Sequence, residues 1–291
     1  MVRPSENVPA GLTETAALDA ASGPPRIVAV NVGNSRVRVG EVVGTRVGEA
    51  VSLPASDPEM TANAIARLAK SEEAGPAAAV VVATVNRPAS EAVIQAARPK
   101  LACGVFRVGE DLPLPMRGRL DPDATTGQDR VLNAMAAFEL LKQAVVVVDA
   151  GTALTVDFVD GEGVFQGGAI APGARMSLHA LHEHTSALPD VGLDTPEETP
   201  FGKSTREAML QGVFFAARGL VRLLVERYAE AYGAYPLVVA TGGDAELIFG
   251  GDELVDRVVP DLTLVGISLA CASALESEDG EGGPDPDEAS S

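Results

Sequence analysis

The fold is decided by the stretch Val145-Val146-Val147-Val148-Asp149-Ala150-Gly151-Thr152. Four consecutive β-branched residues predict a buried strand, and an acid, a glycine and a hydroxyl residue follow at its end. A carboxylate in this place can hold a cation directly or through water, and Thr152 can reach a phosphate oxygen. Backbone N–H groups in a tight turn also bind phosphate. The stretch therefore predicts a phosphate-binding turn between two strands.

An earlier stretch has a similar design. The apolar run from Arg26 leads into Asn31-Val32-Gly33-Asn34-Ser35, and the alternation in Arg36-Val37-Arg38-Val39 predicts a half-buried strand after the turn. We expect Gly33 to adopt backbone angles that other residues avoid. Ordinary hairpins use Gly-Asn turns constantly, so this turn alone is a weak signal. Because 118 residues separate Asn31 from Asp149, the two turns together predict a domain-sized internal repeat.

The order of predicted elements defines four segments. Residues 1–25 and 276–291 have the composition of a disordered leader and a disordered acidic tail. Between them, residues 26–143 form an expected N-terminal lobe and residues 144–275 an expected C-terminal lobe. Thr241-Gly242-Gly243-Asp244 follows a strand and opens a helix, where the backbone can approach an adenine or ribose closely.

Composition limits the possible functions. The chain has 291 residues, a net charge of −19 and only two cysteines, Cys103 and Cys271. The negative charge argues against binding to nucleic acid or to an anionic membrane, and a disulfide framework is not expected. We expect no transmembrane helix, because we find no stretch of eighteen or more apolar residues. The cysteine usage suits a reducing cytosol, so we expect a cytoplasmic protein.

An acid at a strand end before a Gly-Thr turn resembles the actin-like and hexokinase-like phosphotransferases. The resemblance implies a duplicated ribonuclease H-like α/β fold with two lobes and a nucleotide cleft between them. Over residues 27–274 the chain resembles the type III pantothenate kinases. The motifs that carry this resemblance, in order, are Asn31–Ser35, Gly127-Gln128-Asp129-Arg130, Asp149–Ala153, Gly167–Gly173, Thr185–Pro189, Gly202-Lys203-Ser204-Thr205 and Thr241–Asp244.

This resemblance implies phosphorylation of pantothenate by ATP, the first step of coenzyme A synthesis, in a homodimer that uses Mg²⁺ and a monovalent cation (K⁺ or NH₄⁺). It implies that Asp129 is the general base and that Asp149 ligates the monovalent cation. The residues implied to contact ATP are Asn31, Val32, Gly33, Asn34, Ser35, Arg36, Val37, Arg38 and Thr152. Those implied to contact pantothenate are Gly127, Gln128, Asp129, Arg130 and Thr205, the last near the dimer interface.

Chemistry supports two of these roles. A hydroxyl that attacks a phosphate needs an acceptor for its proton, which a carboxylate such as Asp129 supplies. Arg130 can hold a carboxylate with two parallel hydrogen bonds. A surface ion pair in the first turn of a helix is the alternative reading of Asp129 and Arg130.

The chain departs from the family pattern at two places. Asn31 stands where the family has an aspartate, so the first turn loses a charge that attracts hydrated magnesium. The family's Tyr-x-x-Pro element lacks its tyrosine before Pro122. We therefore keep three hypotheses: a pantothenate kinase, a kinase of another small hydroxy acid, and a divergent or non-catalytic relative that binds nucleotide and regulates.

The three histidines of the chain, His179, His182 and His184, lie close together in sequence and suggest a zinc site. Their spacing matches no common zinc motif and no cysteine is near in sequence. We expect these residues to form a solvated helix end. Nothing in the chain matches a nucleophile elbow, a Rossmann fingerprint or a complete P-loop.

Overall fold

The computed structural model describes residues 24–71, 75–120 and 126–279. The expected disordered leader lies outside these ranges except at residues 24 and 25, and Pro122 also lies outside them. The expected tail lies outside from residue 280 onward, while the last helix continues to Asp279. The chain divides into two compact units: the first contains residues up to 115 and those from 263 onward, and the second contains residues 116–262.

The first unit holds a five-stranded sheet with the order β3-β2-β1-β4-β5. Strands β1, β2 and β3 run antiparallel, whereas β1, β4 and β5 run parallel. The bounds are β1 Arg26–Val32, β2 Arg36–Val43, β3 Arg46–Pro54, α2 Pro58–Ala69, β4 Ala79–Thr84, α3 Arg87–Ala97, the 3₁₀ helix η1 Arg98–Lys100, β5 Gly104–Arg107 and α8 Leu262–Asp279.

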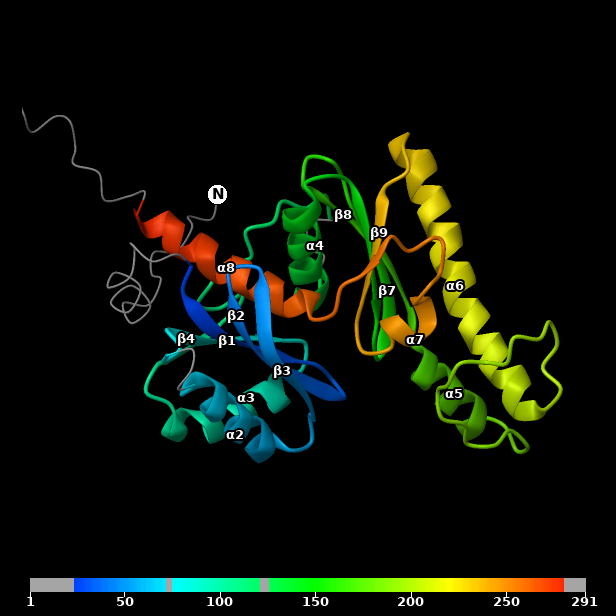
Figure 1. Ribbon diagram of the computed structural model, residues 1–291, viewed down its shortest axis with the longest axis horizontal. Coiled ribbons are helices and arrows are strands. Elements are labelled where there is room, and N and C mark those ends of the chain that lie inside the picture. The colour runs from blue at the N-terminus through cyan, green and yellow to red at the C-terminus, as the bar shows by residue number, and fades with distance from the viewer. Residues whose placement is uncertain (1–23, 72–74, 121–125, 280–291) are drawn as a thin grey trace, which may run out of the picture. The chain divides into compact units, whose positions relative to one another are not determined.

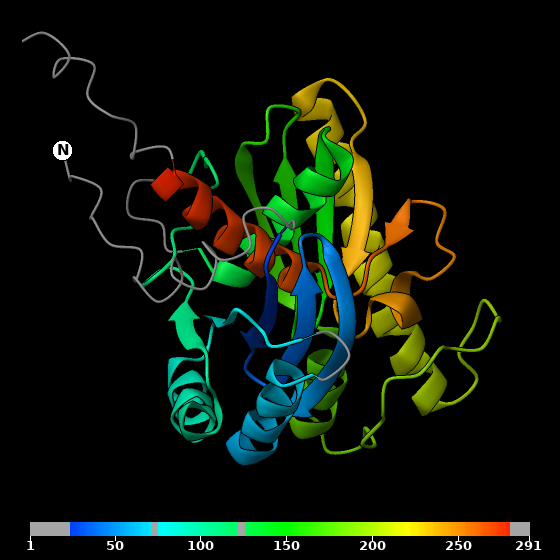
Figure 2. The same ribbon diagram turned by 60° about the vertical axis from the view of Figure 1, so that its left-hand side comes forward.

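Alternation along β1 and β2 gives this sheet two covered faces. Val28, Val30 and Val32 point into a core shared with α2 and α3. On the other face, a Cβ added to Gly40 would lie 2.6 Å from Leu264 Cδ1, so α8 packs directly on β2. Figures 1 and 2 show α2 and α3 on one side of the sheet and α8 on the other.

The second unit repeats this topology, with the strand order β10-β9-β6-β7-β8. Strands β6, β7 and β8 are antiparallel neighbours, and β6, β9 and β10 are parallel. The bounds are α4 Gln128–Leu141, β6 Val145–Ala150, β7 Ala153–Val159, β8 Phe165–Pro172, α5 Ala174–Glu183, α6 Thr205–Tyr232, β9 Leu237–Thr241, α7 Ala245–Phe249 and β10 Arg257–Val258.

The second sheet also has helices on both faces. Val146 and Val148 point into a core that includes α5, α6 and α7, while α4 packs on β6 and β7 from the opposite face. The duplicated α/β fold predicted from the two turns is confirmed, because both sheets share one strand order and one set of strand directions. The sequence repeat predicts a boundary between the lobes at residues 143 and 144. The two compact units divide the chain differently, because α4 belongs to the unit of the second sheet and nearly all of α8 to the unit of the first sheet.

Local rules explain most of the element boundaries. Helix α2 begins after the N-cap Asp57, whose Oδ1 accepts a hydrogen bond from the Met60 N–H at 2.9 Å. Strands β5 and β10 were not predicted, and of α5 only the end at the three histidines was expected. Cys103 and Cys271 are free thiols, as expected.

Helix α6 qualifies the expectation of no transmembrane helix. It is long and apolar enough to cross a membrane by length and composition, with a mean hydropathy of 1.5 over its best window. In this structure 39% of that window is buried inside the protein. Core helices of water-soluble proteins pass the same test, so this is weak evidence for a membrane span.

Candidate active site

Asp149 lies near the end of β6 and faces α4. The Asn133 side chain donates a hydrogen bond from Nδ2 to Asp149 Oδ2 at 2.9 Å. Burial and, next, the charge of Asp129 raise the pKa of the Asp149 carboxyl, and the hydrogen bond from Asn133 lowers it, so that the pKa is about 6. The acid of the second turn is therefore oriented by α4 and lies close to the candidate base.

Helix α4 carries Asp129 and Asn133 on the same face because of the helical period. Asp129 is in its first turn and Asn133 is four residues later, so both lie on one face of the helix. An acid in the first turn is also favoured by the helix dipole. Sequence reasoning missed Asn133, although a polar residue in the apolar helix, one turn after Asp129, is the signal that could have revealed it.

Arg130 makes a buried ion pair that the sequence analysis did not expect. Its Nε donates to both Oδ atoms of Asp157 at 3.1 Å, and its guanidinium lies 5.8 Å from the centre of the Phe165 ring. Burial alone would lower the pKa of Arg130, but the hydrogen bonds and charge of Asp157 raise it. The edge of the guanidinium formed by Nε and Nη2 is thus engaged before any substrate arrives.

The turn Thr241-Gly242-Gly243-Asp244 lies against the Asp149 turn. Thr241 is the register partner of Asp149, and the Asp244 N–H donates to Ala150 O at 2.9 Å. Gly242 has a φ of +97°, and a Cβ there would lie 2.4 Å from Asp149 Oδ1 and 2.5 Å from Ala150 O. Only glycine fits this position, and the two exposed glycines leave this backbone open to a ligand.

The first turn places three polar side chains on one face of β1 and β2. Asn31 pairs with Arg38 in register, and Arg36 lies two residues before Arg38 on the same face. Within the described part of the chain, the Asn31 side chain has no hydrogen-bond partner. The exposed Arg36 donates from Nε to Ser52 Oγ at 2.7 Å.

Other residues of the first turn differ from the expectation. Val32 and Val37 are fully buried in the core, so only their backbone can line a ligand, while Asn34 and Ser35 are exposed. The expectation of unusual angles at Gly33 was wrong, because its φ is not in the left-handed region. A Cβ at Gly33 would lie 3.0 Å from Arg36 O, so the close approach of the hairpin favours glycine there.

Thr205 is separated from Gly127, Gln128, Asp129 and Arg130 within the second unit. It begins α6, on the face of the sheet opposite to α4, and its exposed side chain lines an apolar cavity of about 740 Å³ between α5 and α6. The three histidines lie at the exposed end of α5 or just after it. Among residues 24–71, 75–120 and 126–279, no three His, Cys, Asp or Glu side chains gather as a metal site.

Residues 27–227 match the family model described as type III pantothenate kinase. This chain belongs to the type III pantothenate kinase family. The type III pantothenate kinase of Dehalococcoides mccartyi is 34% identical over 249 residues, which cover 83% of this chain and 94% of that protein.

Two further family members are more similar over shorter segments. The type III pantothenate kinases of Acidiphilium cryptum and Rhodospirillum rubrum are each 42% identical, over 52% and 56% of this chain. The matched segments span 56% and 63% of those two proteins, which is less than two thirds of their length.

A solved structure supports the fold. The crystal structure of a conserved Baf family protein from Campylobacter jejuni superposes with a TM-score of 0.52 at 18% identity, covering 87% of this chain and 99% of that chain. At this identity the likeness concerns the fold alone.

Proposed function

We propose that this protein transfers the γ-phosphoryl group of ATP to the hydroxyl of pantothenate, giving 4'-phosphopantothenate and ADP in the first step of coenzyme A synthesis. One observation carries the proposal: α4 presents Asp129 and Asn133 on one face, and Asn133 holds Asp149 of the phosphate turn. The candidate base is thereby fixed relative to the candidate phosphate site. Family membership supplies the substrate.

The proposed chemistry uses few protein groups. Asp129 accepts the proton of the pantothenate hydroxyl as its oxygen attacks the γ-phosphorus, and the bond from that phosphorus to the bridging oxygen breaks to release ADP. Thr152 is exposed at the second turn, where it contacts the nucleotide. The first turn contributes backbone N–H groups together with Arg36 and Arg38, which line the phosphates.

Two cations belong to the proposal. Asp149 offers carboxylate oxygen, the donor type that suits a hard monovalent cation such as K⁺ or NH₄⁺. Its Oδ2 is oriented by Asn133, which leaves Oδ1 beside Gly242. Mg²⁺ would neutralise phosphate charge, and Asn31 provides an amide oxygen where a carboxylate would attract that ion more strongly. We therefore infer a kinase with weakened magnesium binding.

A homodimer explains the position of Thr205. Phe201, Phe215 and Leu223 expose more than half of their surface, and they lie on α6 or just before it. An exposed apolar surface of this kind favours association with another protein chain. We propose that two copies associate through this helix in the cytoplasm, so that Thr205 of one copy approaches the pantothenate of the other. Light scattering of the purified protein tests the dimer.

The direct test is mass spectrometry of the product formed from ATP, pantothenate, Mg²⁺ and K⁺. Asp129→Asn should lower kcat at least about 100-fold, because the proton acceptor is lost. Stabilisation of the variant by ATP should persist. Wild-type turnover in Asp129→Asn would remove Asp129 from the role of base, and an absence of product from the unmodified protein would contradict the proposal.

The ion pair between Arg130 and Asp157 favours a second candidate acceptor. Because Asp157 already engages the Nε and Nη2 edge of the guanidinium, Arg130 has less capacity to bind a substrate carboxylate than we expected. A hydroxy compound without a carboxylate would then be accepted as well. Comparison of pantothenate with pantothenol, which lacks the carboxylate, tests this: equal kcat/KM values would support the second candidate, and a strong preference for pantothenate would exclude it.

A further inference from the structure

Arg175 and Asp244 form an ion pair beside the second turn. Arg175 Nε donates to Asp244 Oδ1 at 2.9 Å and to Oδ2 at 3.2 Å, and Nη2 lies 2.9 Å from Oδ1. The Asp244 side chain is only 9% exposed, whereas the Arg175 side chain is 62% exposed. One partner is therefore fixed in the protein, and the other faces solvent.

Both partners are attached to the same turn. The N–H of Gly173, two residues before Arg175, donates to Thr152 O at 3.1 Å, and the Asp244 N–H donates to Ala150 O at 2.9 Å. Gly173 packs so closely that a Cβ there would lie 2.2 Å from Gly151 O. A chain of contacts thus runs from Ala150 through Asp244 and Arg175 to Thr152, which keeps the guanidinium near the residues between them.

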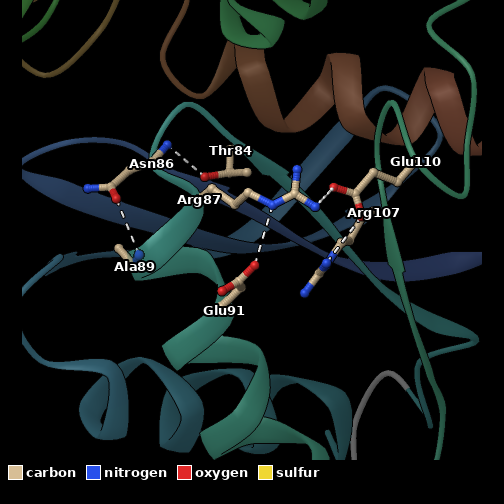
Figure 3. Close-up of polar contacts among 7 residues, drawn as sticks. All are labelled: Thr84, Asn86, Arg87, Ala89, Glu91, Arg107 and Glu110. Carbon is tan, nitrogen blue, oxygen red and sulfur yellow. Dashed lines mark hydrogen bonds and ion pairs between the residues drawn. The ribbon is translucent and has the colours of Figure 1, made fainter.

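The residue of the first unit that is equivalent to Asp244 caps a helix with its side chain. Asn86 occupies the equivalent place, at the N-terminus of the helix after β4, and its Oδ1 accepts a hydrogen bond from the Ala89 N–H at 3.2 Å (Figure 3). Asp244 is the N-cap of α7 but makes no such capping bond. A capping bond contributes about 1 kcal/mol. The carboxylate forgoes it and binds Arg175 instead, so the pair serves more than the stability of α7.

The positive charge of the Arg175 guanidinium suits an anionic ligand. Residues 149–153 carry no cationic side chain, and Asp149 is itself an acid. Phosphoryl transfer requires positive groups that neutralise the phosphate oxygens, and an arginine fork fits phosphate well. With Nε and Nη2 on Asp244, the remaining Nη1 of Arg175 can donate to a phosphate oxygen.

We propose that Arg175, held in place by Asp244, binds a phosphate oxygen of the nucleotide at the second turn. This inference rests on the proposed function only in taking a nucleoside triphosphate as the ligand. It adds a cationic side chain to the second turn.

The experiment is calorimetric titration of the full chain with ATP and with adenosine, in Mg²⁺ and K⁺ and without pantothenate. Arg175→Met should raise the Kd for ATP about tenfold, which is about 1.4 kcal/mol, and leave the Kd for adenosine unchanged. Arg175→Lys should recover part of the loss, because it keeps the charge but not the fork. Arg67→Met is the matched control, since it removes a bidentate pair with Glu49 outside the site, and its ATP affinity should not change.

The outcomes separate the proposal from its alternatives. An unchanged Kd for ATP in a folded Arg175→Met variant would overturn it and leave the pair as a structural tie. An equal loss for ATP and adenosine would also overturn it, because the contact would then not involve phosphate. Binding requires no turnover, so a protein that binds ATP but leaves pantothenate unmodified contradicts only the proposed function. A wild-type chain that binds no ATP contradicts both.

Discussion

The two glycine turns stand at equivalent places in two sheets of the same topology, yet their leading residues, Asn31 and Asp149, differ in their side-chain contacts. Asp149 accepts a hydrogen bond from Asn133 and lies against Gly242, whereas the Asn31 side chain has no hydrogen-bond partner in the described part of the chain. The two units thus share strand order and strand directions, while the length of the hairpin and its polar groups differ. The comparison teaches that the topology of a sheet can be kept while the polar groups of such a turn change.

The largest expected effect comes from making the second turn like the first. Asp149→Asn should lower kcat about 100-fold or more, because the turn loses its carboxylate for the cation. Steady-state rates across a series of K⁺ concentrations should show that the remaining activity no longer responds to the cation. Full activity with normal K⁺ dependence would show that the charge difference between the turns is unimportant.

The same variant should be more stable than the wild type. The pKa of Asp149 is about 6 in the folded protein against an ordinary 3.8, so folding disfavours its charged form. The free-energy cost of holding this carboxylate charged in the folded protein is absent below about pH 4 and grows between pH 4 and 6. Above pH 6 the cost is complete, at about 3 kcal/mol or less. Urea unfolding without nucleotide or K⁺ should show a gain for Asp149→Asn at pH 8 and none at pH 4. A gain of equal size at both pH values would contradict this cause.

Glycine substitutions sharpen the comparison through the backbone. Gly242→Ala should cost about 2 kcal/mol in the free energy of unfolding, because φ is +97° and the Cβ would meet Asp149 Oδ1 and Ala150 O. Gly33→Ala should cost less, since its φ is ordinary and a Cβ would approach only Arg36 O. Chemical denaturation of both variants compares them, and equal costs would show that the left-handed angle at Gly242 is not the main constraint.

The sequence could predict the frame of the site but not its side-chain pairs. The strand predicted from Val145, the strand predicted from Arg36 and the helix predicted after Asp244 are all present, because period and turn residues are local signals. The pairs Asn133–Asp149, Arg130–Asp157 and Arg175–Asp244 join residues 16, 27 and 69 positions apart. No local pattern specifies which of several polar side chains meet across a sheet. The angle at Gly33 was predicted wrongly for a related reason, since a glycine can be required by a neighbouring carbonyl as well as by φ.

Restoring the acid at the first turn tests the comparison from the other side. Asn31→Asp should raise the apparent affinity for Mg²⁺ about tenfold, because a carboxylate attracts the hydrated ion better than an amide does. Magnesium titration of the reaction rate measures it. Asn34→Asp is the control, because it adds the same charge at an exposed position of the same turn and should give no gain. An unchanged magnesium dependence in Asn31→Asp would show that other groups compensate for Asn31.

The smallest effect concerns the helices that follow β4 and β9. Asn86→Ala should cost about 1 kcal/mol, because it removes the bond from the Ala89 N–H to Asn86 Oδ1 (Figure 3). Thr84 should not replace this capping bond, since its Oγ1 already accepts the Asn86 N–H at 2.9 Å.

At the equivalent place, Asp244→Asn removes no capping bond, so its effect should appear in nucleotide affinity and not in the stability of α7. Thermal unfolding and ATP titration of both variants measure the two effects separately. A loss of nucleotide affinity in Asn86→Ala would contradict a purely structural role for Asn86. A loss of stability alone in Asp244→Asn would contradict a role for Asp244 in nucleotide binding.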